Sequence, residues 1–593
     1  MAGFLGAISN CAIVCLVWPA SNPSGSRRPA VDLYSWRLVV LHHSIDSLGS
    51  CSSVSWGSNG AMLTTSSARV GIQALSHSVV RVRMLPPSDE DLRLPPSFAV
   101  IEPGWPAPAV AHEEMTDYVR ISTSDITVRV QKHPLRVSFL RPDGMPVAAD
   151  SPAHGMGWTE RGAGCYKRFA PGTHFYGFGE RTGFLDKQRT AMTLWNSDVN
   201  PHTPGTDSLY VSIPFFIAFS GRSAYGIYMD TAARSAFNMG RPRFMPWTSE
   251  IDLAPLPYPE VDPCEYWFGT DEKRLDYYFF AGPTIPDVVR AYSDLTGRMQ
   301  LPPLWALGYH QCRFSYCPEG QVREVARAMR EADIPCDAIY LDIDYMDGFR
   351  VFTFNPKHFP NPARLMSDLR KDGFNVVTIV DPGVKTDSSY RVYRQGRRRR
   401  VFVRRPDGRT YKGRVWPGVV AYPDFARPAS RTWWADNHKA LFDAGVRGIW
   451  NDMNEPSNFA IDTGTLDETA LHGEPGAEIE HAYVHNAYGN LMSQATQEAF
   501  ARLLPNTRPF IITRAGCGGI QRHACVWTGD NSSWWEHLLM TIPMCCNMSL
   551  SGVSFVGADV GGFMDSADPE LVARWTQMGA FMPLFRSHSM IRS

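Results

Sequence analysis

Beyond residue 300 the sequence alternates between short apolar runs and helical patterns, and this alternation constrains the fold more than any other feature. The first apolar run is LWALGYHQCR at 304–313, followed by the amphipathic pattern EGQVREVARAMREADI at 319–334. One further helix is predicted at 361–372, and seven further strands at 338–344, 375–383, 448–455, 509–515, 524–531, 552–563 and 581–588. Eight apolar strands alternating with helices predict a (β/α)8 TIM barrel over 301–593. An open doubly wound sheet is the alternative, but no glycine-rich phosphate turn supports it.

Residues 66–300 show short alternating runs separated by turn residues, which predict a β-sandwich domain. SVVRVRML at 78–85 and AYGIYMD at 224–230 are examples, and helical periodicity is nearly absent. A chain of 593 residues is also too long for a single hydrophobic core. We therefore expect a sandwich domain followed by a barrel.

Residues 1–65 fit neither pattern, and we expect them to be atypical, either disordered or signal-like. The apolar run FLGAISNCAIVCLVWPA at 4–20 is similar to a signal-peptide core, but no Lys or Arg precedes it. A cytoplasmic location is therefore favoured, and secretion is the alternative if 4–20 acts as a signal. The run is too short for a membrane span and no later segment is as apolar, so we expect no membrane partner.

An insertion at about 385–428 interrupts the alternation and contains the basic run RQGRRRRVFVRRPDGR at 394–409. VFV and PDG within it indicate a solvated strand and turn, and no second basic cluster accompanies it. The net charge is −1, so we expect no nucleic-acid partner. The twelve cysteines are scattered without a histidine cluster, which indicates reduced thiols and no metal site.

Polar side chains stand where the predicted barrel strands end, and in such a barrel these ends converge on one mouth. They are Asp342, Asp344, Asp381, Asp452, Arg514, Asp530, Asp559 and His588. A single acid at a strand end is often only a helix cap. Here, however, Trp450, Trp527 and Phe563 lie within a few residues of three of them. Carboxylates beside aromatic walls, without a metal motif or phosphate loop, suggest a carbohydrate site.

Asp452 and Glu455 follow the apolar run Gly-Ile-Trp, where a buried charge is costly and indicates a function. Glycoside cleavage needs two carboxyl groups, one to attack or activate water and one to protonate the leaving oxygen. Asp452 and Asp530 end the fourth and sixth predicted strands and so lie across the mouth from each other. Glu455 is the rival to Asp452, and we expect it to be a supporting residue.

The stretches GIWNDMNEPSNF (448–459) and VWTGDNSSWWEHL (526–538) closely resemble glycoside hydrolase family 31, specifically its α-glucosidase branch. Further stretches match in the family's order: YGFGERTGFLDK (176–187), YLDIDYMDGFRVFTF (340–354), VWPGVVAYPDF (415–425), FVGADVGGF (555–563) and FRSH (585–588). The resemblance implies an N-terminal β-sandwich, a catalytic barrel and a retaining α-glucosidase without a cofactor. The substrates implied are α-glucosides and malto-oligosaccharides. The family normally continues into two β-domains, so we expect the last barrel helix and these domains to be missing here.

By this resemblance Asp452 corresponds to the nucleophile and Asp530 to the acid/base. Positions that bind hydroxyls of the −1 sugar correspond to Asp342, Arg514 and His588, and those of its apolar walls to Trp416, Trp450, Met453, Trp527 and Phe563. Asp198, in LWNSDVNP, matches a loop reaching from the sandwich towards the +1 sugar. Retention requires the two carboxyl groups to lie about 5–5.5 Å apart. Asp530 must start protonated, with its pKa raised by Trp527 and by the charge of Asp452.

Several alternatives remain open within the resemblance. Related enzymes act on α-xylosides, transfer glucose to another sugar, or trim glucose from glycoproteins. The form DMNEP favours glucose over xylose, and DIDYMDGFRVFTF is similar to the microbial enzymes. A sugar-binding fragment without turnover is an alternative of a different class. Preferred linkage and oligomeric state are not predicted by the sequence.

Overall fold

The computed structural model describes residues 45–88, 96–101, 103–221, 223–241 and 264–590, so the signal-like run at 4–20 lies outside the described residues. Two largely antiparallel sheets form the N-terminal part, and the second also takes in one short strand at 516–517 that pairs in parallel. The first sheet contains β1 (Asp46–Ser47), β6 (Ala111–Glu114), β7 (Tyr118–Ser122), β8 (Thr127–Lys132), β9 (Leu135–Leu140), β10 (Pro146–Asp150), β11 (Met156–Trp158), β12 (Ala163–Arg168), β14 (Ala191–Leu194), β17 (Ser235–Asn238) and β18 (Glu265–Thr270). The second contains β2 (Ser53–Gly57), β3 (Gly60–Thr64), β4 (Arg69–Ala74), β5 (Val79–Leu85), β13 (His174–Gly179), β15 (Val211–Phe219), β16 (Ala224–Met229), β19 (Leu275–Phe280) and β30 (Gly516–Cys517).

The apolar core of this part follows from the period of two in its strands. On β5, Val80, Val82 and Met84 are buried, whereas Arg81 and Arg83 between them are partly exposed. Successive side chains of a strand point to opposite faces, so one face of β5 packs into the core. The buried faces of β4, β7, β8 and β9 belong to the same core.

Residues 53–64, placed by the sequence analysis in the atypical segment 1–65, instead form β2 and β3. Their abundance of Ser and Gly hides a weak alternation in which Ala61 and Leu63 are buried. The helix α1 (Ile285–Thr296) lies within the expected sandwich span. It begins at a capping box between Thr284 and Asp287. The domain limits at 65 and 300 stay a prediction.

The second part is a parallel sheet that returns to itself. Its strands run in the order β32 (Val556–Gly557), β31 (Cys525–Trp527), β29 (Ile511–Thr513), β26 (Gly448–Asn451), β22 (Asn375–Val380), β21 (Ala338–Leu341), β20 (Tyr309–Gln311), β34 (Phe585–Ser587) and β33 (Asp559–Val560). Only Ala558 separates β32 from β33, so the segment 556–560 pairs with β31 on one side and β34 on the other. This confirms the predicted barrel and excludes an open doubly wound sheet.

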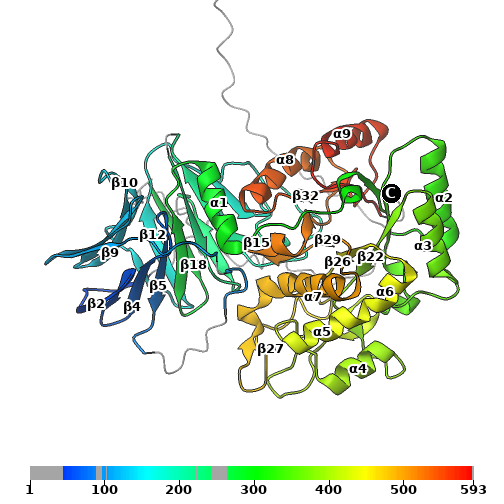
Figure 1. The fold of residues 1–593 in the computed structure, drawn as a ribbon, viewed down its shortest axis with the longest axis horizontal. Coiled ribbons are helices and arrows are strands. Elements are labelled where there is room, and N and C mark those ends of the chain that lie inside the picture. The colour runs from blue at the N-terminus through cyan, green and yellow to red at the C-terminus, as the bar shows by residue number, and fades with distance from the viewer. Residues whose placement is uncertain (1–44, 89–95, 102, 222, 242–263, 591–593) are drawn as a thin grey trace, which may run out of the picture. The chain divides into compact units, whose positions relative to one another are not determined.

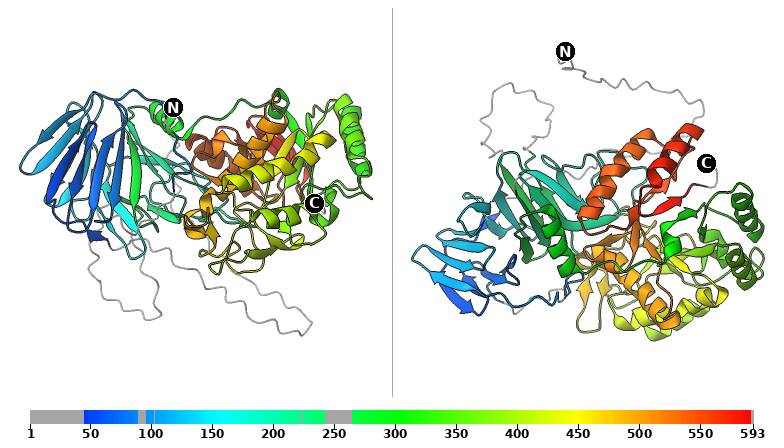
Figure 2. Two further views of the ribbon diagram at one scale, coloured as in Figure 1. Left: turned by 60° about the horizontal axis from the view of Figure 1, so that its bottom comes forward. Right: turned by 45° about the horizontal axis from the view of Figure 1, so that its top comes forward.

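Helices lie outside these strands, as Figure 1 shows. They are α2 (Glu319–Glu331), α3 (Pro362–Lys371), α5 (Pro428–Asn437), α6 (Lys439–Ala444), α7 (Tyr488–Leu503), α8 (Trp535–Leu550) and α9 (Pro569–Gly579). Two further views show the same contrast between the antiparallel strands of the first part and the helix-covered strands of the second (Figure 2). The helices predicted at 319–334 and 361–372 are thus confirmed. No helix among the described residues has the length and apolarity that a bilayer crossing requires.

Two local predictions are wrong. Of the predicted strand at 304–313 only β20 is extended, because Leu304–Leu307 forms a 3-10 turn with Leu304 and Leu307 exposed. The hairpin expected for the arginine run is wrong for its first half, which lies in the helix α4 (Arg391–Arg399). The second half does turn back on itself: Arg404 bridges Thr410 in antiparallel fashion, and the N–H of Arg405 donates to the carbonyl oxygen of Arg409 at 2.8 Å. Arginine favours helices, and the absence of a side chain at Gly396 lets the helix approach the ring of Phe402. A further hairpin of the insertion follows in β24 (Lys412–Val415) and β25 (Gly418–Ala421), and β23 (Val384–Lys385) pairs with β25.

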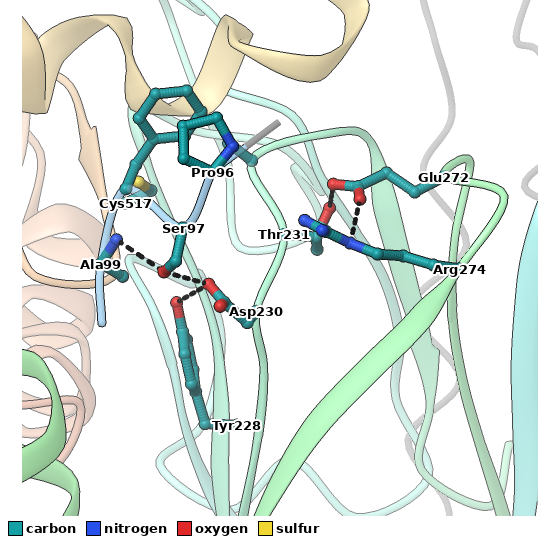
Figure 3. A pocket seen from close by; sticks show the side chains of 11 residues that line it. Pro96, Ser97, Ala99, Tyr228, Asp230, Thr231, Glu272, Arg274 and Cys517 are labelled. Carbon is teal, nitrogen blue, oxygen red and sulfur yellow. Dashed lines mark hydrogen bonds and ion pairs between the residues drawn. The ribbon is translucent and has the colours of Figure 1, made fainter. Parts of the chain in front are cut away.

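A small cavity lies where residues 96–99 meet the end of β16 and Cys517 (Figure 3). Its volume of about 10 Å³ holds at most one water molecule, so it is no sugar site. Asp230 lines it and accepts hydrogen bonds from the hydroxyl groups of Ser97 at 2.8 Å and Tyr228 at 3.5 Å. Burial, with the negative charge of Asp276 added, raises the pKa of Asp230 to about 7.

Replacing this carboxyl group should stabilise the protein at alkaline pH. The folded-state pKa of Asp230 lies above its unfolded value, so stability is lost as the pH rises from about 4 to about 7. Asp230→Asn mimics the protonated form. We expect its free energy of unfolding at pH 8 to exceed that of the wild type by about 1 kcal/mol or more, and its unfolding midpoint to be higher. The difference should vanish near pH 4, and the exposed Glu160→Gln should show no such dependence. A lower midpoint for Asp230→Asn at pH 8 would contradict this.

Candidate active site

The guanidinium group of Arg514 lies among four carboxyl groups at the end of β29. Its Nε is 3.0 Å from Asp452 Oδ1, its Nη2 is 3.2 Å from Asp198 Oδ2, and its Nη1 is 3.7 Å from Asp530 Oδ2. With Glu455 it forms a bidentate pair, at 2.8 Å for each bond. Arg514 is only 2% exposed. One buried cation therefore brings together residues from the sandwich and from three barrel strands.

Asp452 directly follows β26, and its orientation is fixed by the backbone. Its carboxyl Oδ1 accepts the N–H of Met453 at 2.7 Å, and Met453 itself has a left-handed φ of 57°. Such a conformation is unfavourable for a residue with a side chain and is often found at functional sites. Burial raises the pKa of Asp452 to about 6, while Arg514 opposes the rise.

Asp530 lies three residues beyond β31, and its pKa is shifted upward. Burial raises its pKa well above the ordinary value, Arg514 opposes the rise, and the charges of Asp198 and Asp452 add to it. The pKa of Asp452 is thus raised to about 6, and that of Asp530 lies well above its ordinary value. Environments that push two pKa values apart are typical of an acid and a base acting together.

Asp342 and His588 form a second cluster of polar side chains. Asp342 Oδ1 accepts the N–H of Ile343 at 2.6 Å, and its Oδ2 lies 3.8 Å from His588 Nε2. Burial raises the pKa of Asp342 and lowers that of His588. Among the described residues, His588 Nδ1 and Asp381 Oδ1 have no hydrogen-bond partner. Buried polar atoms without partners indicate a place that a ligand or water fills.

Aromatic rings border this polar group. The ring of Trp450 contacts those of Trp527 and His588 edge-on, with centroids 5.7 Å and 5.2 Å apart. Phe563 stacks on His588 at 4.7 Å. Both indole N–H groups are buried and lack an acceptor within the described part of the chain. Apolar rings with free donors suit a sugar, which has apolar C–H faces and polar hydroxyl groups.

Three of the predicted site residues lie apart from Arg514. Asp559 is fully buried in an ion pair with Arg586, whose guanidinium group stacks over the two tryptophans, so Asp559 supports the wall. Asp344 accepts a hydrogen bond from the hydroxyl of Ser315. Trp416 is 47% exposed and contacts only the half-exposed ring of Phe459 edge-on among the described aromatic contacts, at 5.2 Å.

Two residues around Arg514 were missed by the sequence analysis. The ring of Tyr210 lies 4.9 Å from the guanidinium carbon, and its hydroxyl donates to the carbonyl oxygen of Val199 at 3.1 Å and lies 3.4 Å from Asp198 Oδ1. Ser457 accepts from Arg514 at 3.1 Å and donates to Glu455 at 2.7 Å. Ser457 belongs to the NEPSNF stretch, which could have indicated it. Tyr210 had only a strand pattern around it, because its place depends on the pairing of β15 with β30.

The described residues contain no group of three or more His, Cys, Asp or Glu side chains arranged to hold a metal ion. The described cysteines are free thiols, most of them buried. The four acids around Arg514 are instead held by the cation and by hydrogen-bond donors.

Comparisons with known proteins point to one family. Residues 299–593 match the family model of the glycosyl hydrolases family 31 TIM-barrel domain. Residues 69–238 match that of the glycosyl hydrolase 31 N-terminal galactose mutarotase-like domain. Alpha-glucosidase 2 of Bacillus thermoamyloliquefaciens is 45% identical over 524 residues, which are 88% of this chain and 63% of that protein. Neutral alpha-glucosidase AB of Sus scrofa is 38% identical over 435 residues, covering 70% of this chain and 45% of its own length.

Solved structures show the same relationship. The GH31 dextranase of Flavobacterium johnsoniae, complexed with glucose, superposes with a TM-score of 0.82 at 28% identity, over 92% of this chain and 65% of its own. This chain thus spans less than two thirds of the lengths of these three relatives. Both matched models belong to one family, and the barrel model covers the strands that hold Asp452, Arg514 and Asp530. The chain therefore belongs to glycoside hydrolase family 31.

Proposed function

We propose that this chain is a retaining α-glucosidase that releases terminal, non-reducing α-linked glucose from oligosaccharides by double displacement. The main support is the pairing of Arg514 with Asp452, beside Asp530, in a site bordered by aromatic rings. Two carboxyl groups of different pKa next to an apolar wall are what glycoside cleavage requires. The similarity to Alpha-glucosidase 2 over 88% of the chain supports the same assignment.

In the first step, the carboxylate of Asp452 attacks the anomeric carbon while Asp530 gives its proton to the departing oxygen. Esterification removes the negative charge of Asp452, which is one of the charges that raise the pKa of Asp530. Asp530 then ionises more easily and accepts a proton from water, which attacks the glucosyl ester. Arg514 keeps a positive charge 3.0 Å from Asp452 and stabilises its ionised form before the attack.

The remaining site residues bind the substrate. Asp342 accepts hydrogen bonds from neighbouring hydroxyl groups of the −1 sugar, and His588 complements it as donor. The apolar wall around this sugar is formed by Trp450, Met453, Trp527 and Phe563, with Trp416 at the exposed rim. Asp198 reaches from the sandwich towards the leaving sugar, and Glu455 holds Arg514 in place.

Activity should follow a bell-shaped pH profile. Asp452 must be ionised and Asp530 protonated, so kcat/KM should rise through about pH 6 and fall at alkaline pH. Because the charge of Asp452 raises the pKa of Asp530, the two limbs of the profile give apparent pKa values of the pair and not of either residue alone. Glu455 raises the pKa of Asp452, so Glu455→Gln should move the acidic limb to lower pH. The exposed Asp462→Asn on the same loop is the control. An unchanged acidic limb in Glu455→Gln would contradict this electrostatic account.

The proposal is tested by substrate release. The purified chain is incubated with p-nitrophenyl α-glucoside, its β-anomer, the α-xyloside, and maltose. We expect release from the α-glucoside and maltose alone. Preferential release from the α-xyloside would assign the chain to α-xylosidases. Release of p-nitrophenol from the α-glucoside with formation of glucosylated acceptors, but without free glucose, would assign it to transglucosidases. Glucose binding by calorimetry without any release would show a sugar-binding protein without turnover.

A further inference from the structure

Three buried histidines outside the carboxylate cluster form one continuous series of hydrogen bonds. His472 ends β27 (Leu471–His472), which pairs with β28 (Ile479–Glu480), and His481 and His485 begin two short 3-10 turns. All three side chains are fully buried. His472 Nε2 lies 3.0 Å from His481 Nδ1, and His481 Nε2 lies 3.0 Å from His485 Nδ1.

Both ends of this series are hydrogen-bond acceptors. At one end, His472 Nδ1 lies 3.2 Å from Oδ1 of the buried Asp424, whose Oδ2 accepts the N–H of Gly473 at 2.9 Å. At the other end, His485 Nε2 lies 2.8 Å from the carbonyl oxygen of Asn196. A carbonyl oxygen can only accept, so His485 Nε2 carries a hydrogen. We call Asp424, His472, His481 and His485 the histidine chain.

The histidine chain holds one proton more than neutral imidazoles supply. It contains four hydrogen bonds, and each needs one hydrogen. A neutral imidazole has a single N–H, so three rings supply only three. The hydroxyl of Thr465, 3.5 Å from His485 Nδ1, does not supply the fourth, because it donates to Pro456 at 2.8 Å.

The extra proton belongs at the Asp424 end. Burial lowers the pKa of His481, and it lowers that of His485 to about 3, so both of these rings are neutral. The charge of Arg234 adds to this effect: Arg234 lies over the ring of Trp195, which stacks on His485. Arg234 is itself paired with Glu468 at 2.9 Å. The fourth hydrogen therefore lies between His472 and Asp424, where a carboxylate faces it.

Asn196 connects the histidine chain to the catalytic site. Its carbonyl oxygen accepts from His485, and its side-chain Nδ2 donates to the carbonyl oxygen of Gly516 at 3.1 Å. Asn196 lies two residues before Asp198, and Gly516 lies two residues after Arg514. The same residue thus holds the main chain beside both members of the Arg514–Asp198 pair, whose atoms are 3.2 Å apart.

We propose that the singly protonated histidine chain is a positioning device that fixes Asn196, and through it holds Asp198 against Arg514. It links a barrel insertion, a barrel loop and the sandwich loop that carries Asp198. Its effect on catalysis rests on the proposed function, in which Asp198 reaches the leaving sugar. Disruption should therefore impair substrates with a sugar leaving group more than substrates with an aryl leaving group.

Three variants distinguish the role of the extra proton from that of the unbroken hydrogen-bond series and from a general loss of packing. His481→Phe breaks the series, and His481→Gln restores a donor and an acceptor at the same place. Asp424→Asn keeps all four hydrogen bonds without the extra proton, because its amide can accept from Gly473 and donate to a neutral His472. It is the matched control for the charge.

The first readout is independent of activity. With 15N-labelled histidine at pH 8, the wild-type spectrum should show one imidazolium among these three rings, and the Asp424→Asn spectrum should lack it. Hydrogen exchange at residues 195–198 should accelerate in His481→Phe but not in Asp424→Asn. Three neutral rings in the wild type, or unchanged exchange in His481→Phe, would overturn the proposal.

The second readout compares the loss of kcat/KM for a sugar leaving group with that for an aryl leaving group. His481→Phe should lower kcat/KM for maltose about tenfold and that for p-nitrophenyl α-glucoside less than twofold, with recovery in His481→Gln. In an Asp198→Ala background, His481→Phe should have no further effect on maltose. Equal losses on both substrates would show a merely structural role. If the wild type cleaves neither substrate, the proposed function fails, and the spectrum and the exchange rates still decide on the histidine chain.

Discussion

Asp452→Ala is expected to lower hydrolysis of aryl α-glucosides by about 10^4-fold or more, because it removes the proposed nucleophile that forms the glucosyl ester. Asp452 lies 3.0 Å from Arg514, and burial raises its pKa to about 6. Added azide can occupy the vacated space and attack the anomeric carbon once. We expect it to restore part of the activity and to yield the β-glucosyl azide, identified by proton NMR.

Asp530→Ala provides the matched comparison. This variant still forms the glucosyl ester from a substrate with a good leaving group, and azide then displaces Asp452. The product should be the α-glucosyl azide, the opposite anomer. The exposed Asp462→Asn should keep wild-type rates. Near-normal turnover by Asp452→Ala, or the α-azide from it, would reject Asp452 as nucleophile and make Glu455 the candidate.

Arg514→Met is expected to destabilise the fold more than any other single substitution in the site. It removes the cation that Asp198, Asp452, Glu455 and Asp530 share and leaves buried carboxylates without compensation. Removing one partner of a buried ion pair typically costs about 3–5 kcal/mol. We expect a correspondingly lower denaturation midpoint in urea at pH 7.5.

The pH dependence of this loss identifies its cause. At pH 5 the acids take up protons more readily, so the gap between Arg514→Met and the wild type should narrow. Arg514→Lys keeps the charge but loses the bidentate geometry with Glu455, and it should be intermediate. An equal loss at both pH values would show that packing against Tyr210, 4.9 Å away, dominates.

The parallel barrel could be predicted from the sequence because each strand is an apolar run followed by a helical period or a polar strand end. The ends of the strands could not be predicted as well. β26 stops at Asn451, before Asp452, and β20 is only three residues long. Apolar residues can extend beyond the end of a strand, because neighbouring loops bury them there without any strand pairing. Both strand-paired and merely buried residues are apolar, so the sequence pattern does not distinguish them.

The site was predictable where its residues follow barrel strands, as with Asp452, Arg514 and Asp530. Asp559 shows the limit, because nothing local indicates that Arg586 neutralises it inside the wall. Tyr210 and the histidine chain were not predictable, since their partners lie up to 304 residues away, as in the Tyr210–Arg514 contact, and depend on how the sandwich meets the barrel. Separations of this size leave no periodic signal in a single sequence.

The most direct test of the central claim is the anomer released first. Hydrolysis of p-nitrophenyl α-glucoside by this chain is followed by proton NMR within the first minutes, before mutarotation mixes the anomers. Double displacement through Asp452 and Asp530 predicts that α-glucose appears first and then converts slowly to the equilibrium mixture. Initial release of β-glucose would mean single displacement by water and would contradict the assignment of Asp452 as nucleophile.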